Sequence, residues 1–294
     1  MRILGHLIPR LPRLLGAGLL MALMSTGLMT TGLVAAAPMR VVSQTVGTDD
    51  LLMALAPPSQ IAALSHLARD PEFSPYAQQA KRFPCLTNSD AENILRFRPD
   101  LVLVASYTQA STVALLERAH VRVLKVDQFD SLSDLYATTR RIASALGREK
   151  RAEELIRQWQ ARVDALAQRL KGVRPTRVLA VGFYPFTAGS GTTFQDICDH
   201  AGAVNVAAEA GLRGHVPTPS ERVLTWNAEV LVVPGQPNQD LRQRLSQMLP
   251  YKLLPAFKQG RMVVIPDALM AATSQARLDA YEWLARALHP ERFR

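Results

Sequence analysis

The residues of this chain best suited to chemistry are uncharged hydrogen-bonding and aromatic side chains that follow predicted apolar strands. In open parallel sheets, ligands bind where the carboxyl ends of the strands meet. This mixture of side chains suits a bulky, partly apolar ligand better than a bare ion or a small acid. We therefore predict a binding site formed by Gln44, Thr45, His66, Tyr107, Tyr184 and Phe186 at strand ends, with Arg213 and His215 from a long loop.

Recognisable catalytic arrangements are missing from the sequence. It contains no Gly-x-Ser-x-Gly elbow, no phosphate-binding loop, no His-Glu-x-x-His pair and no Cys-x-x-Cys pair. The six histidines are scattered, and the best metal-ligating set, His66 with Asp70 and His215, has no closely spaced pair. We expect a binding protein with no catalytic residue, no metal site and no cofactor. A zinc or manganese carrier, and an envelope enzyme acting on a chelate, remain the alternatives.

A thirteen-residue segment occurs twice. Residues 92–104 read ENILRFRPDLVLV, and residues 221–233 read ERVLTWNAEVLVV. Each copy predicts a short amphipathic helix that leads into a buried strand, which indicates two similar lobes. Glu92 and Glu221 fall in the first helical turn, where a carboxylate gains ~0.3–1 kcal/mol from the helix dipole. The dipole is a sufficient reason for either Glu taken alone. Because both occupy the same position of the repeat, the pair also suits docking to a partner that offers two basic groups.

Strands and helices alternate through both halves of the chain. Apolar runs at 41–46, 61–64, 101–105 and 121–126 predict the strands of one parallel sheet, and runs at 178–183, 230–233 and 262–265 predict a second. Between them, residues 148–170 contain no Gly or Pro and carry apolar residues at helical spacing. A helix of that length spans roughly 35 Å. It is either a surface helix of one lobe or, as its position favours, a strut between the two.

The predicted fold class is therefore α/β, with two Rossmann-like lobes that contain parallel sheets and are joined by a single long α-helix. The expected boundaries are 37–147 for the N-terminal lobe, 148–172 for the interlobe helix and 173–294 for the C-terminal lobe. Cys85 and Cys198 are then in different lobes, 113 residues apart. A disulfide is chemically possible in an oxidising compartment, but two free thiols are favoured.

Residues 1–36 have the pattern of a secretory signal peptide. Arg2, Arg10 and Arg13 precede an uncharged stretch, and small residues follow at 34–37. An uncleaved membrane anchor is the alternative. The formal net charge is +9, and these three arginines contribute to it. Much of the remainder lies on residues 148–174, without interleaved aromatic residues, so we expect a solvated helix face and no nucleic-acid partner.

Four segments, in order, carry a family resemblance. They are RVVSQTVGTDDLLMALA at 40–56, AENILRFRPDLVLV at 91–104, the long central helix, and GTTFQDICDHAGAVNVAAE at 191–209 followed by SERVLTWNAEVLVV. The chain resembles the class III periplasmic substrate-binding proteins of ABC importers, those that serve ferric siderophores, haem and cobalamin. It departs from the family pattern at Ala56 (usually Gly), Ala228 (usually Pro) and Glu229 (usually Asp).

The resemblance implies a monomeric periplasmic protein with limited hinge motion. Such a protein would capture an iron complex (ferric siderophore or haem) or cobalamin in the interlobe cleft. It would deliver this metal chelate or corrinoid to an ABC permease with its ATPase, and would contact the membrane only through that permease. Glu92 and Glu221 match the two lobe glutamates that meet permease arginines. The ligand within this group is left open.

Overall fold

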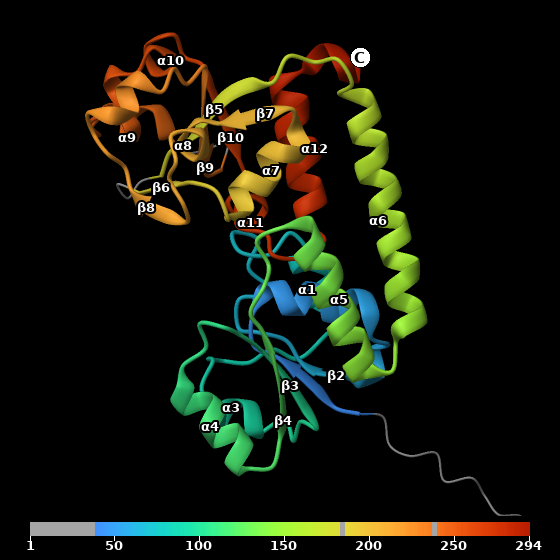
Figure 1. Cartoon of the computed structure of the whole chain (residues 1–294). Coiled ribbons are helices and arrows are strands. Elements are labelled where there is room, and N and C mark those ends of the chain that lie inside the picture. Colours follow the sequence, from blue (N-terminus) through green and yellow to red (C-terminus); the bar gives the residue numbers. More distant parts are fainter. Residues whose placement is uncertain (1–38, 183–185, 237–239) are drawn as a thin grey trace, which may run out of the picture. The chain divides into compact units, whose positions relative to one another are not determined.

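The computed structural model describes residues 39–182, 186–236 and 240–294, which belong to one compact unit (Figure 1). The predicted signal peptide, 1–36, and the predicted site residue Tyr184 lie outside these ranges. Within the described residues, no helix is both long enough and apolar enough to cross a membrane.

The first lobe is built on a four-stranded parallel sheet with strand order β2-β1-β3-β4. Its strands are short apolar runs, and β1, β2 and β3 are buried along their whole length, as expected of a parallel sheet covered on both faces. The strands are β1 (Val41–Ser43), β2 (Ile61–Ala63), β3 (Leu101–Ala105) and β4 (Arg122–Val126). The accompanying helices are α1 (Val46–Leu55), η1 (Pro58–Gln60), α2 (Ala77–Ala80), α3 (Ala91–Leu95), α4 (Ala110–Arg118) and α5 (Leu132–Leu146).

The second lobe repeats this plan. Its parallel sheet has the order β10-β9-β5-β7, which, read from the other edge, places the strands in the same chain sequence as the first sheet. The strands are β5 (Thr176–Ala180), β7 (Ala203–Asn205), β9 (Val230–Pro234) and β10 (Met262–Ile265), and β6 (Phe186–Ala188) pairs separately with β8 (His215–Pro217). The helices are α7 (Thr193–Ala201), α8 (Val206–Glu209), η2 (Arg222–Thr225), α9 (Leu241–Ser246), η3 (Tyr251–Leu253), α10 (Pro255–Lys258), α11 (Asp267–Met270), α12 (Arg277–Leu288) and η4 (Pro290–Phe293). The prediction of two α/β lobes with parallel sheets is confirmed.

The two copies of the repeated segment differ in their helices. In the first copy, Asp90 caps α3 by accepting a hydrogen bond from the backbone N–H of Asn93 at 2.8 Å. The equivalent position in the second copy is Pro219, which has no polar side chain, and the predicted helix there is only the single 3-10 turn η2. The expectation that Glu221 lies within the first turn of an α-helix is therefore wrong, since Glu221 directly precedes η2.

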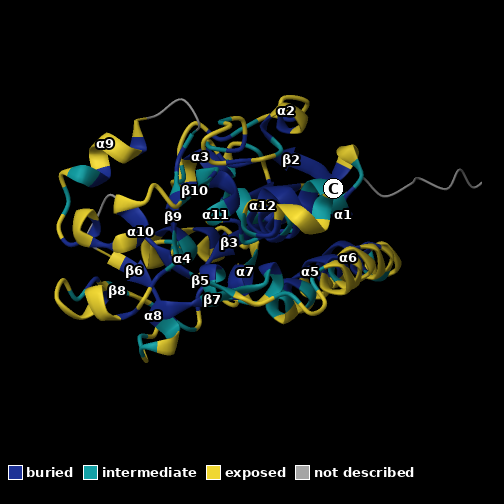
Figure 2. Cartoon of the chain, turned by 90° about the horizontal axis from the view of Figure 1, so that it is seen from above, coloured by how far each residue is buried: buried dark blue, intermediate teal, exposed yellow. Residues whose placement is uncertain are grey.

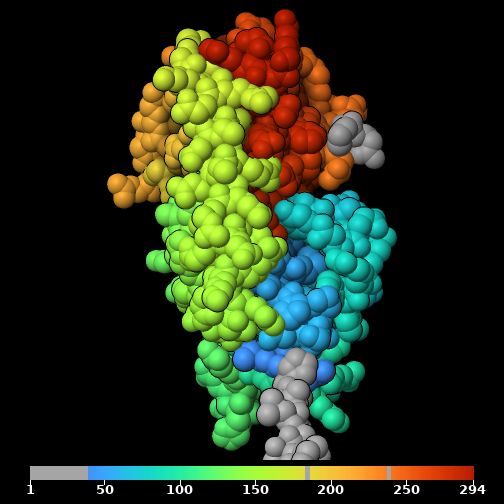
Figure 3. Space-filling model, turned by 90° about the vertical axis from the view of Figure 1, so that its right-hand side faces the viewer, coloured from blue at the N-terminus to red at the C-terminus, as the bar shows by residue number. Residues whose placement is uncertain are grey.

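The long central helix is α6 (Glu149–Arg169), which runs beside elements of both lobes (Figure 3). Near its start, the guanidinium of Arg151 donates to the carbonyl of Ala54 at the end of α1 at 3.3 Å. Further along the helix, Arg162 pairs with Asp279 and Glu282 of α12 at 2.8 and 2.9 Å. The outward surface of α6 is exposed, whereas the strands β1, β2 and β3 are buried (Figure 2).

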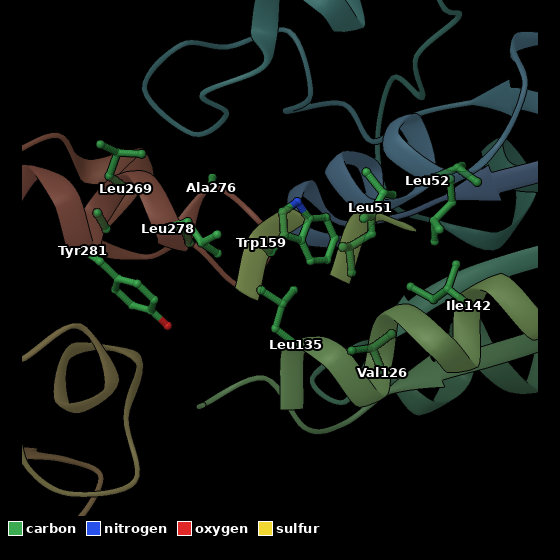
Figure 4. Packing of buried hydrophobic residues seen from close by; sticks show 14 of the residues in the cluster. Leu51, Leu52, Val126, Leu135, Ile142, Trp159, Leu269, Ala276, Leu278 and Tyr281 are labelled. Carbon is green, nitrogen blue, oxygen red and sulfur yellow. The ribbon is translucent and has the colours of Figure 1, made fainter. Parts of the chain in front are cut away.

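The largest hydrophobic cluster is shared by the two lobes (Figure 4). Trp159 of α6 stands among Leu51 of α1, Leu135 of α5 and Leu278 of α12, and only 6% of it is exposed. A core that is continuous across two lobes resists their separation, because opening it would expose apolar side chains to water. Separating the lobes would therefore cost part of this apolar burial.

A buried polar network at the same junction adds to this constraint. Asp196 of α7 accepts hydrogen bonds from the backbone N–H of Leu132, at 2.9 Å, and from the hydroxyl of Tyr281. It also accepts from the guanidinium of the fully buried Arg277 at 3.2 Å. Arg277 in turn donates to the carbonyl of Phe129. Residues that follow the first sheet are thereby joined to α7 and α12 of the second lobe.

Candidate functional site

A cavity of about 610 Å³ opens where the carboxyl ends of the first sheet face the second lobe. Residues that follow β1, β2 and β3 form one wall, and residues 268–273, in α11 and the loop after it, form the other. The lining comprises Gln44, Thr45, Val46, Gly47, Asp50, Ser65, His66, Leu67, Phe73, Pro75, Asn88, Ser89, Asp90, Tyr107, Thr108, Gln109, Thr112, Ala268, Ala271, Ala272 and Thr273. Its position agrees with the general rule for parallel sheets.

Four predicted site residues, Gln44, Thr45, His66 and Tyr107, line this cavity. The amide of Gln44 is held on both sides, because it donates to the carbonyl of Ser89 at 2.7 Å and accepts from the hydroxyl of Thr108 at 2.6 Å. These two hydrogen bonds join three neighbouring loops and fix the orientation of the amide. The structure thus brings these four predicted residues together on one wall, and their ligand-binding role stays a prediction.

His66 and Tyr107 are the two described lining residues whose aromatic side chains carry a polar atom. The Nδ1 atom of His66 lies 3.2 Å from the hydroxyl of Ser89, which leaves Nε2 as the nitrogen able to meet a ligand. Tyr107 is 72% exposed and stands at the mouth. Desolvation raises the pKa of its hydroxyl, and a hydrogen bond with Thr45 opposes that rise, so the phenol is neutral at physiological pH.

The other predicted residues are grouped elsewhere. Phe186 lies on β6, His215 lies on β8 opposite Ala188, and Arg213 pairs with Ser190 just before β8. None of them is among the residues that line the cavity. The second-lobe wall is formed by residues 268–273, which follow β10, and not by residues that follow β5. A ligand-binding role for Phe186, Arg213 and His215 stays a prediction, and Tyr184 lies outside the described residues.

Asp50 is a buried acidic lining residue that the sequence does not single out. It is 2% exposed, and its carboxylate accepts hydrogen bonds from the hydroxyls of Ser274 at 2.7 Å and Ser74 at 3.4 Å. Burial raises its pKa to about 7, against the opposing effect of the bond from Ser274. The preceding residue, Asp49, is also buried with a pKa of about 7, but it faces the backbone N–H of Ser65 at 3.0 Å and does not line the cavity. From the sequence alone, Asp49 and Asp50 are predicted only to be acidic residues at the start of a helix.

The charge of the lining is one-sided. Asp50 and Asp90 are its acidic members, and no Lys or Arg occurs among the described lining residues. Most of the remaining polar groups are hydroxyls and amides. Buried negative charge is costly without a cationic partner, so this surface complements neutral or positively charged groups better than anionic ones.

The alternative of a metal-ion site finds no ligand cluster in the part of the chain that the structure describes. There, no three or more His, Cys, Asp or Glu side chains are close enough together to hold a metal ion. His66, Asp70 and His215 are thus not brought together. Cys85 and Cys198 are both free, and burial raises the pKa of each thiol, which lowers its reactivity.

Glu92 and Glu221 are both exposed. Glu92 follows the lining residue Asp90 by two positions, and its carboxylate lies 3.5 Å from Arg96, with side chains 86% and 71% exposed. Such an exposed pair contributes little to stability and leaves the carboxylate accessible to a partner.

Comparison with known proteins identifies this architecture. The model of the periplasmic binding protein family matches residues 41–269, most of the chain. The chain belongs to this family. Its fold is that of the class III periplasmic binding proteins of ABC importers, and the resemblance carried by the sequence segments is confirmed.

Relatives of this family member differ in the ligands that their names give. The molybdate-binding protein MolA of Haemophilus influenzae is 25% identical over 233 residues, which cover 71% of this chain and 66% of MolA, just under two thirds of its length. The structure of the periplasmic heme-binding protein RhuT from Roseiflexus superposes with a TM-score of 0.74 at 23% identity, over 87% of this chain and 99% of RhuT. A periplasmic heme-binding protein from Pseudomonas aeruginosa gives 0.71 at 22% identity, over 86% and 93%. At these identities the two structures show the shared fold.

Proposed function

We propose that this chain is the solute-binding component of an ABC importer and that its cargo is a bulky metal chelate without net negative charge. The cavity between the lobes, lined by hydroxyls, amides and two carboxylates, is the observation that carries the proposal. The chelate would be a ferric siderophore or a corrinoid such as cobalamin. It would be captured there and delivered to the permease with its ATPase.

The residues of the lining favour this cargo over molybdate and over haem, the ligands in the names of similar proteins. A tetrahedral oxyanion such as molybdate is best held by charge-assisted donors, and the described lining offers no Lys or Arg. Haem has two carboxylates, which would also find no Lys or Arg in the described lining. His66 and Tyr107 are nevertheless residue types that ligate haem iron. A chelate with amide, hydroxamate or ammonium groups matches the hydroxyls, amides and carboxylates that are present.

Binding of defined probes tests this proposal. The purified protein would be titrated with ferrioxamine B, cyanocobalamin, hemin, molybdate and zinc, with heat or visible absorption as the signal. We expect one ferrioxamine or corrinoid per chain, with much weaker binding of hemin and molybdate. Stoichiometric binding of molybdate or zinc alone would refute the proposal. A His66→Ala, Tyr107→Ala variant should weaken binding of the chelate, while a Phe186→Ala, His215→Ala variant tests the group that lies on β6 and β8.

Docking to the permease is proposed for Glu92 and Glu221. Reversing both to Lys should abolish uptake into cells and leave the affinity for the chelate unchanged, because neither residue lines the cavity. The matched control reverses Glu117 and Glu291, two exposed acids on α4 and η4. Uptake that survives the first pair, or that is lost equally with the control pair, contradicts the docking role.

Export is part of the same proposal. Residues 1–36 would be removed as a signal peptide, and the mature protein would act as a periplasmic monomer. Mass spectrometry of protein recovered from the envelope fraction should give a mature chain that begins near residue 37. A full-length chain retained in the membrane fraction would favour the uncleaved anchor instead.

A further inference from the structure

Among the described lining residues, Asp50 is the acidic side chain that is buried, and its carboxylate accepts only from neutral donors. Its two partners, Ser74 and Ser274, are hydroxyls that come from opposite lobes. Each carboxylate oxygen accepts one of these bonds and can accept more. No ion pair involves Asp50 among the described residues.

We propose that Asp50 selects cargo by charge, by accepting hydrogen bonds from a protonated amine carried by the chelate. This inference rests on the proposed function and names the feature of the cargo that the cavity recognises. An ammonium group supplies up to three donors and a full positive charge, and a carboxylate in a low-dielectric site binds such a group far more strongly than a neutral donor. The amine would reach the wall where α1 faces the segment before α12.

The surroundings of Asp50 support a cationic group and oppose an anionic one. Asp49, next to it on α1, adds a second negative charge that raises the pKa of Asp50, and Asp90 is a further acidic residue of the lining. Tyr76, near the same carboxylate, contributes a neutral phenol whose pKa is raised by burial. His66 is the other titratable lining residue, and its Nδ1 is turned to Ser89.

A purely structural role for Asp50 makes a different prediction. If its only task were to join the lobes through Ser274, loss of its charge would weaken all ligands alike. Asp50→Asn keeps the size of the side chain and an oxygen that accepts from Ser274, and removes the charge. Asp49→Asn is the matched control, because Asp49 is an equally buried neighbour that does not line the cavity.

Two forms of one chelate provide the test. Ferrioxamine B carries a terminal ammonium, and its N-acetylated form has the same iron centre with a neutral amide in that place. We expect the wild type to bind the ammonium form on the order of tenfold more tightly or better, in line with a charged hydrogen bond. Asp50→Asn should bring the ratio of the two affinities near one, whereas Asp49→Asn, which leaves the carboxylate in the lining in place, should reduce the ratio much less.

The outcomes separate the two proposals. If the wild type binds both forms equally, or if Asp50→Asn keeps the preference, the role of Asp50 is overturned while the chelate-carrier function stands. If neither form binds and hemin or molybdate does, both proposals fail. The wild-type ratio requires no variant, so the inference can be refuted even if Asp50→Asn does not fold.

Discussion

Replacing Arg277 by Met tests whether the buried polar network holds the two lobes together. Arg277 is 0% exposed and donates to the carbonyls of Ala272, at 3.0 Å, and Phe129, and to Asp196 at 3.2 Å. Met fills a similar volume with neither charge nor donors. Removal of one partner of a buried ion pair costs ~3–5 kcal/mol, because it leaves the other charge uncompensated. The two carbonyls also lose a donor, which adds to that cost.

The loss is large beside the total stability of a protein of this size, which is of the order of 5–15 kcal/mol. We expect the midpoint of thermal unfolding to fall by about 10 °C, and urea unfolding to report a free-energy loss of about 4 kcal/mol. The Asp196→Asn, Arg277→Met double variant should be less destabilised than the two single losses combined, since it leaves no unpaired charge. A loss below about 1 kcal/mol for Arg277→Met, or strict additivity in the cycle, would refute the reasoning.

Three further variants or conditions probe the described residues. Because burial raises the pKa of Asp49 and Asp50 to about 7, the folded protein keeps protons that the unfolded chain releases above pH ~4. Urea unfolding should therefore show stability falling between pH ~4 and 7, by up to ~4 kcal/mol per residue, and Asp50→Asn should remove its share of that slope. In Gly189→Ala the new methyl would lie 2.2 Å from the carbonyl oxygen of Leu212, so a drop of several degrees in thermal shift is expected. Trp159→Ala should cost ~3–5 kcal/mol in urea unfolding, since Trp159 is 6% exposed in the shared core, and a loss below 1 kcal/mol would contradict that packing.

The parts of the fold that the sequence predicted well are those set by local pattern. Buried parallel strands are continuous apolar runs, and the predicted strand at 101–105 matches β3 residue for residue. The central helix was predicted at 148–170 and is observed at 149–169, because its apolar spacing continues without Gly or Pro. The first-lobe wall of the cavity followed from the same strands.

The rest depended on contacts between distant segments. Residues 268–273 form the second wall of the cavity only because α11 faces α1, and nothing in their own sequence marks a binding surface. Asp50 was missed for the same reason, since its partner Ser274 lies 224 residues away. The 3-10 turn η2 was mistaken for an α-helix because the apolar pattern of the repeat outweighed the missing cap at Pro219.

Much of the repeated segment has a structural task in both lobes. Asp100, at the start of β3, accepts from the backbone N–H of Arg40 at 2.7 Å, and Glu229, at the start of β9, accepts from that of Arg177 at 3.1 Å. The guanidinium of each arginine also donates to a backbone carbonyl of the repeat. Arg40 donates to Phe97, after α3, at 2.7 Å, and Arg177 donates to Trp226, after η2, at 2.9 Å. The two clamps are equivalent, so the fold alone accounts for the shared acid near the end of each copy.

The two glutamates at the front of the repeat take no part in this clamp. Glu92 lies in the first turn of α3, where the helix dipole gives it a modest structural reason to be there. Glu221 precedes a single 3-10 turn, whose dipole is too short to favour an acid strongly, yet the same residue type is retained in register. The helix dipole therefore explains Glu221 poorly, although Glu221 matches Glu92 in the repeat. For the pair of glutamates, docking to a basic partner is therefore a stronger hypothesis than the helix dipole. Charge reversal of Glu92 and Glu221, compared with the reversal of Glu117 and Glu291, tests that hypothesis directly.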